Sequence, residues 1–287
     1  MQLIKRNLLI FFRDKAAVFF SLFSVLIILG LYMLFLGSIM EEGLQEGLGF
    51  ESDKISVVIA SLTLAGMVAV TSVTSCLGAL GVSISDKERA GKDFRTSPAS
   101  RKRILAGYIF SSGIIGLIMT VAALVICIVY LSVKGAAFPS PADCALLLMT
   151  SVLSVLCGNS IVFFVTIFIK SQNAYTSIST IIGTLIGFLM GIYIPIGTFP
   201  VPVQWVIKLF PMTHAAGMFK QILADGELAE LFSAAPPETL EGFREMYGVV
   251  FTYGGYTSGF GFSAIVLAAT TILFYTLSLV IMRLRHD

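Results

Sequence analysis

Residues 55–85 read ISVVIASLTLAGMVAVTSVTSCLGALGVSIS, and no Asp, Glu, Lys or Arg interrupts this run. The segment directly after it, residues 86–103, reads DKERAGKDFRTSPASRKR and is densely charged. An apolar run of about 20 residues is long enough for an α-helix to cross a bilayer. The two stretches together predict a membrane-spanning helix that is followed by a polar loop at the membrane surface.

The overall composition agrees with this interpretation. Hydrophobic residues make up 56% of the 287 residues, charged residues make up 13%, and the mean hydropathy is +0.92. A soluble domain is usually about 45–50% apolar and about 25% charged. The composition therefore excludes a soluble globular enzyme, a disordered chain and a secreted disulfide scaffold. The net charge of +2 gives no reason to expect nucleic-acid binding.

Five other long runs without charged side chains predict five further spans. The expected spans are residues 16–40, 55–85, 104–133, 144–169, 174–194 and 259–282. The fifth run continues into a proline-rich stretch that cannot extend a helix, so its span is expected to stop at residue 194. We therefore expect an all-α polytopic membrane protein with six transmembrane helices, which form a single transmembrane domain over residues 1–287.

The charged residues divide unequally between the two sides of this arrangement. Fourteen of the 19 Lys and Arg residues lie on the side of the two termini and residues 86–103, and 12 of the 17 acidic residues lie on the other side. Loops rich in Lys and Arg stay in the cytoplasm. Both termini are therefore expected to be cytoplasmic, and the 195–258 loop is expected to be extracellular.

The two halves of the 195–258 loop differ in character. Residues 195–223 are too apolar for a water-exposed loop and predict short re-entrant helices, one of which starts at Pro211 and ends near Leu223. The acidic residues 225–245 predict an external hairpin or cap whose role is open.

Residues 1–15 predict an amphipathic helix before the first span. Ile4, Leu8, Phe11 and Phe12 share one helical face, which is typical of an interfacial helix on the cytoplasmic leaflet. The alternative is a plain charged flank of the first span. The residues that we assign to this helix are Arg6, Phe12, Arg13 and Asp14.

The 86–103 loop allows two interpretations. Ser97 followed by Pro98 is typical of an N-cap and a first helical residue, so a short helix and a turn are expected before the third span. The loop could be a basic topological signal, which explains its charge. A docking surface explains better why acidic and basic side chains surround Phe94.

Small and hydroxyl residues are frequent in the second and fifth spans, and Gly183, Gly187 and Gly191 recur at intervals of four residues, which predicts a stripe of glycines on one helical face. The simpler interpretation is helix packing, because small residues let helix backbones approach closely. The more specific interpretation is that these residues line a subunit interface or a pathway for an amphiphilic molecule. The residues concerned are Met67, Thr71, Thr74, Ser75, Thr180, Gly183, Gly187 and Gly191. Asn159 in the fourth span predicts a helix–helix hydrogen bond.

Signatures of catalytic chemistry are missing from the sequence. It has no phosphate-binding glycine loop of the Walker A type, no HExxH and no CxxC, and its two histidines are expected on opposite sides of the membrane. We expect the chain to bind no cofactor and to depend on a partner for energy.

Three stretches resemble a known family. They are KRNLLIFFRDKAAVFFSLF at residues 5–23, DKERAGKDFRTSPASRKRILAGY at residues 86–108, and the proline-punctuated segment from Pro195 to Pro211. Together with the expected six spans, they are similar to the membrane subunit of an ABC-2 type transporter, the permease of a type V ABC exporter. The acidic segment is longer than in the minimal family pattern.

The resemblance implies roles for particular residues. The chain would form half of a dimeric pore with a second copy or a close homologue, and a separate ATPase subunit would bind ATP and Mg. The residues implied in coupling to that subunit are Glu88, Arg89, Lys92, Phe94, Arg95, Ser97, Pro98 and Arg101. Lys170, Gln172 and Asn173 would make a second contact, and Pro195, Pro200 and Pro211 would belong to an extracellular gate.

The function implied by the resemblance is ATP-driven export through a bacterial plasma membrane. The short chain without a fused ATPase favours a drug-like or lipid-like substrate. Export of a polysaccharide, glycolipid or peptide is the alternative within the family. A non-transporting membrane scaffold, or a channel, is the alternative outside it.

Overall fold

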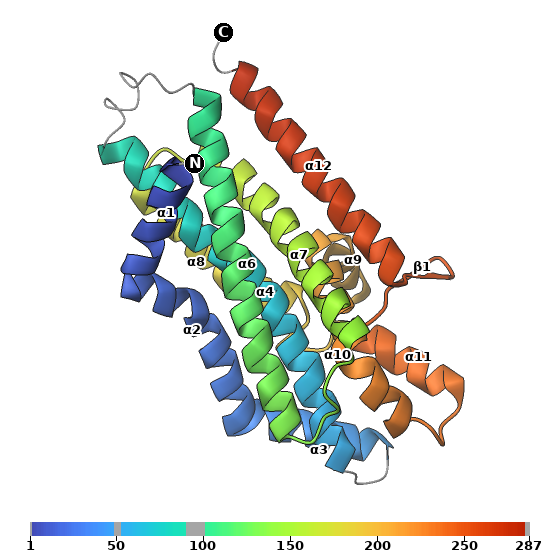
Figure 1. Cartoon of the computed structure of the whole chain (residues 1–287). Coiled ribbons are helices and arrows are strands. Elements are labelled where there is room, and N and C mark those ends of the chain that lie inside the picture. Colours follow the sequence, from blue (N-terminus) through green and yellow to red (C-terminus); the bar gives the residue numbers. More distant parts are fainter. Residues whose placement is uncertain (1, 49–52, 90–100, 285–287) are drawn as a thin grey trace.

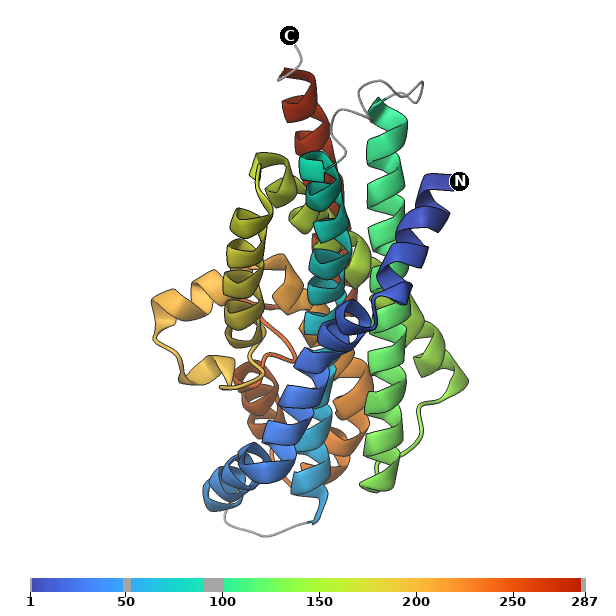
Figure 2. The same ribbon diagram turned by 90° about the vertical axis from the view of Figure 1, so that its left-hand side faces the viewer.

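The computed structural model describes residues 2–48, 53–89 and 101–284 and is almost entirely helical. The first half contains α1 (Gln2–Arg13), α2 (Lys15–Leu31), the π-helical segment η1 (Tyr32–Leu36), α3 (Gly37–Leu48), α4 (Asp53–Arg89) and α6 (Arg101–Val133). α7 (Pro141–Phe168), α8 (Gln172–Leu189) and α12 (Phe260–Leu284) complete the long helices. Successive long helices run in opposite directions, and the start of α1 and the end of α12 point to the same end of the bundle (Figures 1 and 2).

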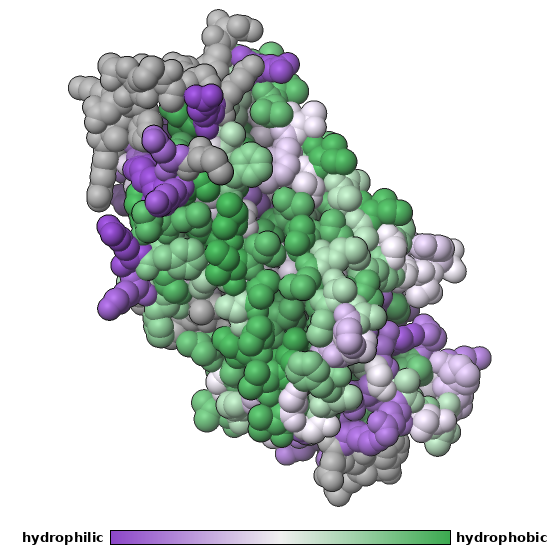
Figure 3. Space-filling view, viewed as in Figure 1, coloured by the Kyte–Doolittle hydropathy of each residue, from purple (hydrophilic) through white to green (hydrophobic). Residues whose placement is uncertain are grey.

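Within the described residues, four helices are long and apolar enough to cross a membrane. These segments are Lys54–Glu88, Arg103–Val133, Pro141–Phe168 and Phe260–Leu284. Apolar side chains cover the middle of the face seen in Figure 3, and hydrophilic ones gather toward its two ends. The all-α membrane architecture expected from the sequence is therefore confirmed, whereas the count of six spans and their orientation stay predictions.

The first expected span is built differently from a single straight helix. The helix is interrupted by the π-helical segment and continues as α3 to Leu48, beyond the end that we expected at residue 40. The buried Tyr32 begins the π-helical segment, and its hydroxyl donates to Glu41 Oε1 at 3.3 Å and to the Ser56 carbonyl at 3.2 Å. These bonds tie α3 to the start of α4.

The fifth expected span ends earlier than predicted. α8 stops at Leu189, not at residue 194, because Gly191 adopts a left-handed conformation with φ of 62°. The Ile192 N–H donates to the Gly187 carbonyl at 3.1 Å, and the Gly191 N–H donates to the Phe188 carbonyl at 3.1 Å. This is a Schellman motif, which ends a helix without a proline.

α4 forms the centre of the bundle and is buried along most of its length. Small residues let its neighbours approach closely: a Cβ at Gly116 of α6 would lie 2.7 Å from Cys76 Sγ. Ser72 and Ser154 share a hydrogen bond of 2.6 Å between α4 and α7. Much of the small-residue content of α4 therefore serves packing inside one chain.

Asn159 of α7 bonds to α6, as predicted. Its side-chain oxygen accepts from Ser112 Oγ at 2.7 Å, and its amide nitrogen donates to the Ile109 carbonyl at 2.9 Å.

The segment between α8 and α12 folds into short helices and a hairpin. They are η2 (Ile196–Thr198), α9 (Val201–Leu209), α10 (Pro211–Leu231), α11 (Pro237–Met246), β1 (Thr252–Tyr253) and β2 (Tyr256–Thr257). α10 starts at Pro211 as predicted but continues to Leu231, beyond the predicted end near Leu223. The acidic segment contains the end of α10 and most of α11, which the ion pair between Asp225 and Arg244 holds together, and its external location stays a prediction. α10 packs against α4, α7 and α12.

Candidate functional site

A three-residue cluster joins α1, α4 and α6 at one end of the bundle. The Arg6 guanidinium donates two hydrogen bonds of 2.8 Å to the two oxygens of Asp86, one to each. The Tyr108 hydroxyl donates to Asp86 Oδ2 at 2.5 Å. The hydrogen bond to Asp86 raises the pKa of Arg6, so the guanidinium stays charged throughout the physiological range. The cluster holds α1 against the end of α4.

Two α1 residues outside the set that we assigned to the interfacial helix anchor it to the bundle. Phe11 is buried in a cluster with Ala79, Ile115 and Met119, and Asn7 donates to Ser111 Oγ at 3.1 Å. Phe12, Arg13 and Asp14 are assigned residues that the structure leaves exposed. The sequence signal for Asn7 was a polar amide next to the apolar face that Ile4 and Phe11 form.

The two regions predicted as coupling contacts, the end of α4 and the start of α8, lie together at the end of the bundle that also holds the Arg6–Asp86 pair. The Gln172 backbone N–H, at the start of α8, donates to Glu88 Oε1 of α4 at 2.7 Å. Ser85 Oγ donates to Gln172 Oε1 at 3.1 Å. Lys170 and Asn173 lie beside this junction with exposed side chains.

Most of the predicted coupling residues lie outside the described part of the chain. Lys92, Phe94, Arg95, Ser97 and Pro98 fall between residues 90 and 100. Arg89 ends α4 and Arg101 begins α6.

The predicted pathway residues of α4 face the interior of this chain. Met67, Thr71 and Ser75 are fully buried, and Thr74 is partly buried. They therefore pack within one protomer in this conformation.

The predicted glycine stripe does not lie on one helical face. Gly191 follows the end of α8, and a Cβ at Gly187 would lie 2.3 Å from the Tyr193 ring. A Cβ at Gly183 would meet nothing within 4 Å. Of these three glycines, only Gly183 leaves room for a neighbouring backbone. The stripe expected from the spacing was wrong, because the Schellman turn folds the chain back over Gly187.

Instead of a glycine stripe, α8 exposes a row of threonine hydroxyls. Thr176, Thr180 and Thr184 are exposed and occupy one face at intervals of four residues. Each hydroxyl donates to the carbonyl four residues earlier, at 2.9–3.0 Å. These hydroxyls are therefore satisfied without a partner from another molecule.

Two ionisable residues in α10 were not predicted as functional. Lys220 is buried, and its ammonium donates to the carbonyls of Tyr247 at 2.8 Å and of Met190 and Gly191 at 3.4 Å. Met190 follows the last turn of α8, so Lys220 bonds the carbonyl end of that helix, which carries partial negative charge. Burial lowers the pKa of Lys220 to about 7. A lone Lys in an apolar stretch was the sequence signal for this contact.

His214 lies in an aromatic cluster near the start of α10. Its ring contacts Phe251 and Tyr253, with centroids 5.0 and 6.4 Å apart, and Nδ1 shares a hydrogen bond of 3.1 Å with Ser263 Oγ of α12. Burial lowers the pKa of His214 to about 4, so the ring is neutral at pH 7.

The three predicted gate prolines stand at helix starts. Pro195 and Pro200 precede η2 and α9, and Pro211 is the first residue of α10. Proline suits these positions because its missing N–H would have no helical partner there.

Comparison with known protein families gives a match over most of the chain. A family model described as ABC-2 type transporter matches residues 1–224, which include α1, the Arg6–Asp86–Tyr108 cluster and most of α10. A search of curated proteins finds no match.

Proposed function

The chain belongs to the ABC-2 type transporter family, and we propose that it is the permease of an exporter driven by a separate ATPase subunit. Proteins of this family are membrane components of ABC transporters and carry no ATPase of their own. The proposed energy source is ATP with Mg, bound and hydrolysed by the partner subunit.

The junction of Glu88 with Gln172 is the observation that carries this proposal. It joins the end of α4 to the start of α8 at the end of the bundle that also holds the Arg6–Asp86 pair. A displacement of this end of the bundle would therefore move α1, α4 and α8 together. Such an arrangement suits a docking surface that passes motion from a soluble subunit into the membrane.

The proposed docking surface contains the charged loop after α4. Acidic and basic side chains around an aromatic residue are typical of a protein interface, where charges set the register and an aromatic anchor supplies affinity. Phe94 is the proposed anchor. Lys170 and Asn173 are the proposed second contact, since they lie exposed beside Gln172.

The exposed threonine face of α8 is the proposed contact with a second permease copy or a close homologue. Its satisfied hydroxyls and the open space at Gly183 would let another helix approach closely. A path beside such a face would suit an amphiphilic, drug-like or lipid-like substrate that leaves the cytoplasm or the inner leaflet. Export of a polysaccharide, glycolipid or peptide is the second candidate.

The coupling experiment compares Glu88→Ala, Glu88→Gln and Phe94→Ala with Lys134→Ala at the opposite end. Tagged permease is purified from its native bacterial membrane, and any P-loop ATPase that co-purifies is identified and quantified by mass spectrometry. We expect Glu88→Ala and Phe94→Ala to reduce its recovery and Glu88→Gln, which keeps an acceptor for Gln172, to reduce it less. No ATPase with the wild-type permease, or equal recovery with all variants, would contradict the proposal.

The direction of transport and the orientation of the chain in the membrane are tested separately. Cys at residue 229 should react with an impermeant thiol reagent on intact cells, and Cys at residue 90 should react only after permeabilisation. Uptake of a lipophilic dye into the lumen of inverted membrane vesicles that occurs only with ATP would support export of amphiphiles. Conductance without ATP would indicate a channel instead.

A further inference from the structure

Four aromatic side chains gather where α9 and the β1–β2 hairpin meet the start of α12. The rings of Trp205 in α9 and Tyr253 in β1 have centroids 6.1 Å apart. The Phe262 ring of α12 lies 5.8 Å from the Tyr253 ring and 5.6 Å from the Tyr256 ring. We call Trp205, Tyr253, Tyr256 and Phe262 the surface aromatic cluster. None of the four was assigned to coupling, to the pathway or to the gate.

The surface aromatic cluster is open on the side that faces away from the bundle. Trp205 is 47% exposed and Tyr256 is 55% exposed. Val201 and Leu209, four residues to either side of Trp205, are more exposed still. Residues four apart share one face of a helix, so α9 presents three large apolar side chains outward.

The charged residue of α9 lies on the opposite face. Lys208 is buried, and its ammonium pairs with Glu245 at 2.9 Å and donates to the Thr252 carbonyl at 3.4 Å. A helix on a protein surface in water usually exposes its charged side chains and buries its apolar face. Because α9 keeps its charge inside and its apolar face outside, the outward face fits surroundings that are less polar than water.

The hairpin and α12 continue this uncharged surface. Residues 246–282 contain no Asp, Glu, Lys or Arg. α12 is long and apolar enough to cross a membrane, and it begins at Phe260, shortly after β2 ends at Thr257. The surface aromatic cluster therefore lies at one end of a segment that lipid can surround. Trp and Tyr are enriched at this level of a bilayer, because they combine an apolar ring with a polar N–H or O–H.

The helix α11 lies next to the hairpin, on the side away from the C-terminus (Figure 1). Its residues Glu238 and Glu241 are exposed. Figure 3 shows hydrophilic side chains in this region, whereas the middle of the bundle is apolar. The surface thus changes from apolar on α12, through the surface aromatic cluster, to acidic on α11. A bilayer changes from apolar to polar in the same order, and this match favours lipid over a second copy of the chain as the partner of the cluster.

We propose that the surface aromatic cluster and the outward face of α9 form an anchor in the lipid–water interface of the bilayer. Trp205 and Tyr256 lie at the level of the phospholipid headgroups, and Val201 and Leu209 contact the adjoining acyl chains. The anchor fixes the depth of α12, and with it the depth of α10, which packs against α12. It does not rest on the proposed export function, because insertion of these side chains needs neither an ATPase nor the α8 face.

The sequence supplies its own probe, since Trp205 is the sole tryptophan of the chain and its fluorescence reports this position alone. The full-length wild-type protein is reconstituted into nanodiscs of phosphatidylcholine that carries bromine near the headgroups (6,7-dibromo) or near the bilayer centre (11,12-dibromo). Bromine quenches tryptophan fluorescence on contact. We expect the shallow bromines to remove more of the Trp205 emission than the deep bromines, and soluble acrylamide to remove little of it.

Reference positions are made in a Trp205→Phe background. Leu273→Trp, at an exposed position near the middle of α12, should be quenched more by the deep bromines. Glu238→Trp, at an exposed position on α11, should be quenched by acrylamide and not by brominated lipid. Tyr256→Trp should follow the pattern of Trp205, because both residues belong to the proposed anchor.

Three results would overturn the proposal. Quenching of Trp205 mainly by acrylamide would place the cluster in water. Resistance to both brominated lipids and to acrylamide would show that protein covers the face, as a second copy of the chain would. Stronger quenching by the deep bromines than by the shallow ones would place Trp205 in the bilayer interior. The central measurement uses the wild-type chain, so loss of folding in a variant cannot imitate any of these results.

Discussion

Replacing Asp86 with Ala should loosen α1 from the bundle. The Tyr108 side chain is 7% exposed, and loss of its acceptor leaves a buried hydroxyl unpaired, which costs about 1–3 kcal/mol. Loss of the pair with Arg6 adds less than about 1 kcal/mol, because the Arg6 side chain is 40% exposed and water screens the charge. We therefore expect Asp86→Ala to lower the free energy of unfolding by about 2–3 kcal/mol.

The assay is equilibrium unfolding by sodium dodecyl sulfate in mixed micelles, together with trypsin cleavage within α1. Arg6→Ala and Tyr108→Phe should each cost less than Asp86→Ala, about 1 kcal/mol, because each leaves Asp86 one of its two partners. Cleavage at Lys5 and Arg6 should become faster in Asp86→Ala.

The matched control is Glu230→Ala at the opposite end. Glu230 pairs with Lys54, but its side chain is 62% exposed, so removal should cost less than about 1 kcal/mol. If Asp86→Ala were no more destabilising than this control, and α1 no more accessible to trypsin, the cluster would not hold α1 in place.

Three further predictions concern α10 and α8. Because burial lowers the pKa of His214 to about 4, the unfolded state binds more protons between pH 6.5 and 4, and the free energy of unfolding should fall as the pH drops through this window. His214→Gln should flatten this pH dependence, and an equal slope in both proteins would argue against it. Lys220 contributes at higher pH. Its pKa of about 7 lies below the usual 10.5, so the unfolded state binds more protons between pH 7 and 10.5, and the free energy of unfolding should rise with pH in this range. Lys220→Met should lose that rise, and a rise of wild-type size would refute the assignment. Gly187→Leu should destabilise the turn after α8, because the Tyr193 ring lies 2.3 Å from the added Cβ and must move away, whereas Gly183→Leu should fold normally but impair assembly or transport. Size-exclusion chromatography and transport measure both, and a well-folded Gly187→Leu would mean that the turn after α8 can move.

Sequence patterns predicted the membrane class, the family and the four helices that are long and apolar enough to cross a membrane. These features depend on composition and on local runs of apolar residues, since a helix of sufficient length buries its own backbone groups in lipid. The bond from Asn159 to its neighbouring helix was also predictable, because a polar amide inside an apolar span needs a partner. The helix start at Pro211 followed from local backbone chemistry in the same way.

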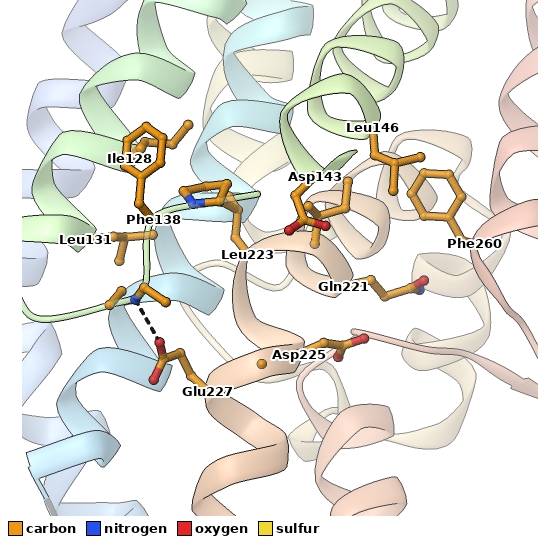
Figure 4. A pocket seen from close by; sticks show the side chains of 15 residues that line it. Ile128, Leu131, Phe138, Asp143, Leu146, Gln221, Leu223, Asp225, Glu227 and Phe260 are labelled. Atoms are coloured by element: carbon orange, nitrogen blue, oxygen red, sulfur yellow. Dashed lines mark hydrogen bonds between the residues drawn. The ribbon is translucent and has the colours of Figure 1, made fainter. Parts of the chain in front are cut away.

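Features that depend on contacts between distant residues were decided by the tertiary structure alone. The early end of α8 required the Gly191 turn, and the spacing of glycines in the sequence could not show that Tyr193 would cover Gly187. The pairing of Arg6 with Asp86 joins residues 80 positions apart. A cavity lined by residues such as Asp143, Gln221 and Phe260 combines side chains from α6, α7, α10 and α12 (Figure 4). Local patterns report how each helix meets lipid or water, but which side chains meet one another depends on how the helices pack.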